Sequence, residues 1–110
     1  MLNMAMSRAA SGLLRALLQR LGDQSDRILL SEVQSVDWQS LTFTGETHWL
    51  SLRVCGPGAE AIAGLFTDGI EDAEFAIPGH LVADIVLAGA PVRALDGSVT
   101  LAIEALTVAE

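Results

Sequence analysis

Residues 80–108 read HLVADIVLAGAPVRALDGSVTLAIEALTV, and this stretch sets the fold class. On both sides of Asp96-Gly97 its apolar residues alternate with a period near two, which is typical of half-buried β-strands. Asp-Gly is a favoured two-residue turn because both positions accept positive φ. The stretch therefore predicts one long β-hairpin that is closed by Asp96-Gly97.

The two arms of this hairpin constrain their register. A regular ladder around Asp96-Gly97 would place Leu101 on the same face as Asp84 and leave Ile85 on the other face. One inserted residue restores the match between Ile85 and Leu101. Gly89-Ala90-Pro91 tolerates such an insertion, because proline cannot donate to the ladder and glycine is common at bulges. We expect a bulge or bend there.

The second face of the hairpin is also apolar. It carries Val82, Asp84, Val86, Thr100, Ala102, Glu104, Leu106 and Val108. A sheet that is apolar on both sides needs two covers, and one inserted helix supplies only one of them. The other cover is either the N-terminal helix or a second copy of the same face. Because large apolar patches usually mark interfaces, we expect a homodimer whose interface includes Val82, Val86, Leu106 and Val108.

Helical periodicity occurs in two segments. The apolar residues between Met6 and Leu21 recur at helical spacing and predict a helix over 4–21 that ends before Gly22. Its opposite side carries Arg8, Ser11, Arg15 and Gln19. Gly56-Pro57-Gly58 opens a second helix over 58–68, since proline fits the first turn of a helix.

The remaining segments predict short strands. Residues 28–36 fit either period at first, but 31–36 favour a strand. The runs around 41–43 and over 48–55 are joined by a turn at Gly45, and a short strand covers 71–77. The predicted order is α-β-β-β-α-β-β-β. We expect a single α+β domain over 1–110, with a mainly antiparallel sheet of five to six strands, an N-terminal helix and one inserted helix.

Charge divides the 110 residues into a basic arm and an acidic body. All six basic residues are arginine, and residues 1–22 hold three of them and no acid. Residues 23–110 hold fourteen acids and three arginines, a net charge of −11 that argues against nucleic acid, whose binding needs cations facing phosphates. We expect the amphipathic arm over 1–22 to pack on its own sheet. A protein partner and an anionic membrane surface are the alternatives.

The cysteine count and the hydropathy pattern limit the cellular compartments in which we expect this protein. Cys55 stands alone, so an intramolecular disulfide is impossible and a disulfide-stapled scaffold is excluded. The first residues do not resemble a signal peptide, because no charge precedes Arg8. No apolar run is long enough to span a bilayer, since Asp84 interrupts the most apolar stretch. We expect a cytoplasmic protein without a transmembrane segment.

Few residues have side chains that could take part in catalysis or in ligand binding. The candidates for a ligand pocket are His48, Trp49, His80 and Asp84. Four residues of strand separate His80 from Asp84 by roughly 13 Å, too far for a shared metal ion. Isolated ligands do not make a metal or cofactor site, and we expect neither. The sequence favours a small noncatalytic protein-binding or assembly module. The alternative is a small-molecule-binding protein or enzyme with a pocket between sheet and helix near His48 and His80.

Overall fold

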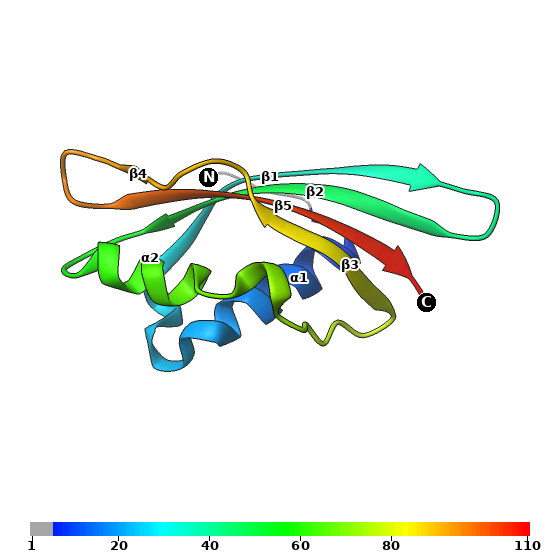
Figure 1. Ribbon diagram of the computed structural model, residues 1–110, viewed down its shortest axis with the longest axis horizontal. Coiled ribbons are helices and arrows are strands. Elements are labelled where there is room, and N and C mark those ends of the chain that lie inside the picture. The colour runs from blue at the N-terminus through cyan, green and yellow to red at the C-terminus, as the bar shows by residue number, and fades with distance from the viewer. Residues whose placement is uncertain (1–5) are drawn as a thin grey trace.

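The computed structural model describes residues 6–110 as two layers, a β-sheet with both helices on one of its faces (Figure 1). This confirms the predicted α+β class. The elements are α1 (Arg8–Leu18), the 3₁₀ segment η1 (Gln19–Arg27), β1 (Ile28–Gln39), β2 (Thr44–Val54), α2 (Ala59–Thr67), the 3₁₀ turn η2 (Ile70–Asp72), β3 (His80–Leu87), β4 (Val92–Arg93) and β5 (Val99–Ala109).

The five strands form one antiparallel sheet in the order β1-β2-β5-β3, and the short β4 also pairs with β5. Two strands, and not three, precede α2, because β1 is one continuous strand from Ile28 to Gln39. The turn to β2 covers 40–43, where the Ser40 N–H donates to the Phe43 carbonyl at 2.8 Å. The turn predicted at Gly45 is therefore wrong, since Gly45 lies within β2 opposite Trp38.

The strand predicted over 71–77 is also absent, apart from a single bridge between Ile77 and His80. The chain there forms the short η2 turn and then an irregular segment that leads into β3. Ile70 and Ile77 are nevertheless buried in the core, so the segment covers one end of the helix layer.

The N-terminal helix is shorter than the predicted 4–21. It begins at Arg8 because the Ser7 hydroxyl accepts a hydrogen bond from the Ala10 N–H at 3.1 Å, an N-cap interaction. The chain passes into η1 after Leu18, and Gly22, with a φ of 54°, interrupts the helical conformation there. Residues 4 and 5 lie outside the described part of the chain.

Both helices cover the same face of the sheet. Leu13 and Leu17 of α1 and Phe66 of α2 are buried in one core together with Leu52 and Leu101 of the sheet. Arg20, in η1 just after α1, is bound to the end of α2. Its Nε donates to the Phe66 carbonyl at 2.9 Å and its Nη2 donates to the Asp68 carbonyl at 2.5 Å. The N-terminal helix therefore packs on its own sheet, but it does not cover the second face.

The register of β3 against β5 confirms part of the predicted pairing of the two hairpin arms. Ile85 and Leu87 share the helix-covered face with Leu101, as predicted. The extra residue lies in the turn, since Ala94 pairs with Ser98 around a three-residue loop. The segment 89–91 is a break between β3 and β4, and a true bulge lies between Val82 and Asp84.

Replacing Leu17 tests how firmly α1 is docked. Leu17 is fully buried in the core, so Leu17→Ala should lower the free energy of unfolding by about 2–5 kcal/mol through lost burial and a residual cavity. The matched control is Leu14→Ala on the same helix, where the side chain is only half-buried. Urea unfolding checks both variants. Equal losses for the two variants would contradict the packing described.

Candidate interaction surface

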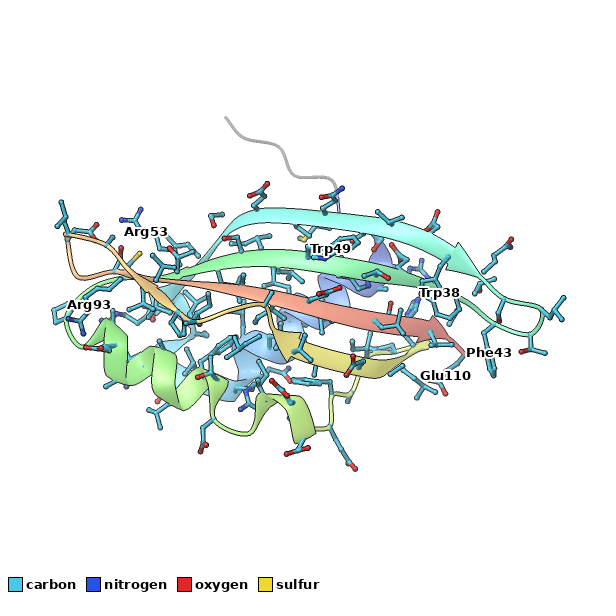
Figure 2. The ribbon with its side chains drawn as sticks, turned by 45° about the horizontal axis from the view of Figure 1, so that its top comes forward. Trp38, Phe43, Trp49, Arg53, Arg93 and Glu110 are labelled. Carbon is cyan, nitrogen blue, oxygen red and sulfur yellow. The ribbon has the colours of Figure 1, made fainter. Side chains whose placement is uncertain are left out.

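The face of the sheet away from α1 and α2, here called the open face, has no cover among the described residues (Figures 1 and 2). Every second residue of a strand points to this face. These residues are Leu29, Glu32, Gln34, Val36 and Trp38 from β1; Gly45, Thr47, Trp49, Ser51 and Arg53 from β2; Thr100, Ala102, Glu104, Leu106 and Val108 from β5; Leu81, Asp84 and Val86 from β3; and Val92 from β4.

The open face is most apolar toward the C-terminal end of β5. Val36 is 48% exposed, Leu81 55% and Trp49 38%, which is high for large apolar side chains. The pairing of Leu81 with Val108, and of Val36 with Leu106 through Thr47, makes the surface continuous across four strands. The open-face patch is defined here as Val36, Trp49, Leu81 and the half-buried Val86, Leu106 and Val108.

Three of the four predicted interface residues lie in this patch, namely Val86, Leu106 and Val108. Val82 does not, because the bulge between Val82 and Asp84 turns it toward the helices, where it packs against the core. A bulge adds one residue to one strand and so reverses which face the residues beyond it occupy. The sequence pattern predicts one inserted residue between the arms and not this second one, so it wrongly assigns Val82 to the open face.

Three carboxylates stand on the open face beside the patch. Glu104 lies opposite both Trp49 and Val86, Asp84 lies opposite Leu106, and Glu32 lies on the edge strand β1. Asp84 and Glu104 rim a hollow of about 240 Å³. Its remaining lining is Thr47, Val86, Ala105 and Leu106. The surface therefore combines apolar area with unneutralised negative charge.

Arg53 is the one basic residue that the described strands place on the open face, and it is held at the β4–β5 turn. Its Nη2 donates to the Asp96 carboxylate at 2.5 Å, and its Nε donates to the Ser98 hydroxyl at 3.0 Å. Hydrogen bonds from the Ser98 hydroxyl and N–H lower the pKa of Asp96, and the charge of Arg53 adds to this effect. Arg53 is thus engaged away from Glu104 and Asp84.

On the helix-covered face, His48 fastens three strands together. The ring is fully buried, with Nδ1 2.7 Å from the Ser35 Oγ of β1 and Nε2 2.8 Å from the Thr107 Oγ1 of β5. Thr107 in turn donates to the Glu46 carbonyl at 3.4 Å. One proton arrangement satisfies the chain: Ser35 donates to Nδ1, and the Nε2–H donates to Thr107. Burial lowers the pKa of His48, the charge of Glu46 partly offsets this effect, and the charge of His80 adds to it. The ring is therefore predominantly neutral above pH 6.5.

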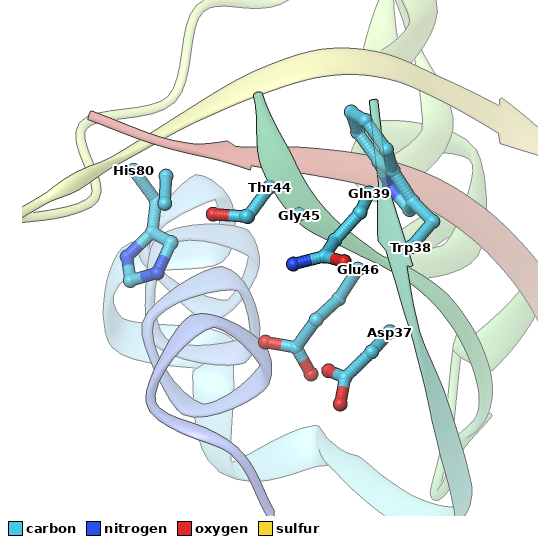
Figure 3. Close-up of a pocket in the computed structure, with 8 residues that line it drawn as sticks. Asp37, Trp38, Gln39, Thr44, Gly45, Glu46 and His80 are labelled. Atoms are coloured by element: carbon cyan, nitrogen blue, oxygen red, sulfur yellow. The ribbon is translucent and has the colours of Figure 1, made fainter. Parts of the chain in front are cut away.

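A cavity of about 570 Å³ lies beside the β1–β2 hairpin (Figure 3). Asp37 and Glu46 stand side by side in it on adjacent strands, and His80 lies at its border, with Nδ1 3.2 Å from the Pro78 carbonyl. The other lining residues are Trp38, Gln39, Thr44, Gly45 and Ala109. The sequence did not predict Asp37 and Glu46, because only the register of β1 against β2 shows that they are neighbours.

The four residues predicted for a ligand pocket lie in different places. His48 and His80 are on the helix-covered side of the sheet, whereas Trp49 and Asp84 are on the open face. Of the four, His80 lines the cavity beside the hairpin, and Asp84 lines the hollow of the open face. The structure does not bring them together into one site.

Residues 6–110 contain neither a metal-binding cluster nor a membrane-spanning helix. No group of three or more His, Cys, Asp or Glu side chains there could hold a metal ion. None of the helices there combines the length and the apolar character needed to cross a bilayer.

The neutral His48 predicts a pH dependence of stability. Because the pKa of His48 in the folded protein lies below its ordinary 6.5, the unfolded chain takes up the proton first as the pH falls. The free energy of unfolding should be highest above pH 6.5 and should decrease below it, until the folded-state pKa is reached. Urea unfolding at several pH values should show this decrease in the wild type. It should persist in His80→Gln, because burial is the largest cause of the shift and the charge of His80 the smallest.

The matched variant His48→Gln should lose that part of the pH dependence, although it is less stable at every pH. If His48→Gln does not fold, an NMR titration of the wild-type ring gives the answer directly. A His48 pKa at or above 6.5 would contradict the neutral, strand-fastening role.

Comparison with known proteins identifies the fold and no family. No family model and no curated protein matches the chain. A chain in the solved structure of the virion of a native gene transfer agent particle is similar, with a TM-score of 0.64 and 14% identity over 94% of this chain and 99% of that chain. At this identity the likeness shows that the two chains share a fold.

Proposed function

We propose that this protein is a noncatalytic subunit of a protein assembly and that it self-associates through the open-face patch. The observation that carries the proposal is the placement of both helices on one face of the sheet, which leaves the apolar second face without a cover among the described residues. Apolar surface of this kind is usually buried against another protein.

Two further observations support this proposal. Arg20 and Arg27 bind backbone carbonyls, Arg53 binds the turn at Asp96, and the buried His48 fastens strands, so these polar groups serve structure. The similar chain belongs to a virion particle, which is itself a protein assembly. The lone, half-buried Cys55 suits a reducing compartment, and we propose the cytoplasm.

A substitution that introduces a charge into the open-face patch tests the proposed self-association. Wild-type protein at micromolar concentration should sediment as a dimer or larger species, above the monomer mass of 11.6 kDa. Leu106→Glu should sediment as a monomer, because the change removes apolar contact area from the centre of the patch and puts there a carboxylate that is costly to bury. Leu95→Glu is the matched control, since Leu95 is fully exposed at the β4–β5 turn. A wild type that is monomeric under these conditions would refute self-association.

A second candidate function is the binding of a small molecule in the cavity beside the β1–β2 hairpin. The observation in its favour is the pair of carboxylates, Asp37 and Glu46, which face that cavity near His80. A cationic compound is the ligand that this charge would attract. A thermal-shift screen of amines, nucleotides and divalent metals tests the idea, because a ligand at a hundred times its Kd adds about 2.7 kcal/mol of stability. The absence of any shift, or a shift that Asp37→Asn leaves unchanged, would exclude it.

A further inference from the structure

The six arginines of the chain fall into two groups. Arg20, Arg27, Arg53 and Arg93 each donate to a carbonyl or a carboxylate of the same chain. Arg8 and Arg15, both on α1, are exposed, and neither makes a hydrogen bond or salt bridge to any described residue. The arginines without a described partner are thus confined to one helix.

These two arginines share one side of α1. Seven residues separate them, which is nearly two turns, so both point away from the core at roughly 10 Å along the helix axis. Ser11 and Gln19 lie on the same side, which we call the α1 outer stripe, while Leu13 and Leu17 face the sheet. The segment 1–22 contains no acid that could neutralise this stripe.

The open face offers the complementary charge. Glu104, Asp84 and Glu32 stand on it, and Arg53 is bound to Asp96 at the far turn. Glu32 and Glu104 are two strands and two residues apart, about 12 Å by ordinary sheet dimensions. This separation is close to that of the two arginines, and Trp49 lies on the strand between them. A guanidinium there would meet a carboxylate and the face of an aromatic ring.

We infer that the α1 outer stripe of a second copy lies on the open face, with its arginines directed to Glu104 and Glu32. The inference rests on the proposed self-association and names the surface of the second copy that covers the open face. α1 and the open face lie on opposite sides of the molecule (Figure 1). A contact between them is head-to-tail, so repeated copies form a ring or a filament, whereas a homodimer would join two like surfaces.

Charge reversal on each surface tests the inference with the full-length protein. Arg15→Glu and Glu104→Arg should each reduce the wild-type assembly to monomers in sedimentation velocity, because each places like charges in the contact. An equimolar mixture of the two variants should restore the wild-type distribution. In the mixture the new carboxylate of one variant meets the new guanidinium of the other, and the native pair of Arg15 with Glu104 forms at the alternate contact.

Arg93→Glu is the matched control, since it changes the net charge equally on β4 and should leave the assembly as in the wild type. If Glu104→Arg does not fold, Glu32→Arg mixed with Arg8→Glu replaces the first pair of variants. A wild type that assembles, with loss of assembly in Leu106→Glu but not in Arg15→Glu, would overturn the head-to-tail contact and leave the proposed function standing, with a like-to-like dimer as its form. A monomeric wild type would overturn both.

Discussion

The packing of α1 and α2 against one and the same face of the sheet governs the whole domain. Leu13, Leu17 and Phe66 fill that face together with the inward residues of β2 and β5, and Arg20 fixes the two helices to each other through the carbonyls of Phe66 and Asp68. A two-layer domain has no third layer that could cover the other face. The open-face patch is the direct result, and it is the surface that a partner can reach.

The polar groups of the helix-covered face are arranged for rigidity. His48 is fully buried and is bound on both sides by hydroxyl groups, from Ser35 on β1 and Thr107 on β5. Buried polar groups of this kind are costly unless their donors and acceptors are paired, and both ring nitrogens are paired here. The network fixes the register of three strands and thereby fixes which side chains the open face presents to a partner.

Much of the fold could be predicted from the sequence, because its signals are local. Leu13 and Leu17 recur at helical spacing, and the alternation around Leu101 is that of a strand with one buried face. A turn was predicted at Gly45 because glycine is common in turns. That prediction was wrong, since Gly45 lies within β2. Gly45 instead leaves room for its neighbours in the sheet, since a Cβ there would clash with the Thr107 carbonyl oxygen of β5 and would fall 2.7 Å from the Trp38 ring.

The candidate site was harder to predict, because it depends on contacts between distant parts of the chain. The bulge beside Ala83 has no local signature, so Val82 was assigned to the wrong face. The side on which α1 packs depends on contacts such as that of Arg20 with Phe66, which no local pattern reveals.

Intrinsic fluorescence shows whether the open face is the surface that becomes covered on assembly. Trp38 and Trp49 are the two tryptophans of the chain, and both lie on that face. Raising the protein concentration should shift their emission to shorter wavelengths and reduce quenching by acrylamide, in step with the rise in sedimenting mass. Emission and quenching that stay constant while the mass rises would show that another surface drives assembly, and would contradict the role proposed for the open-face patch.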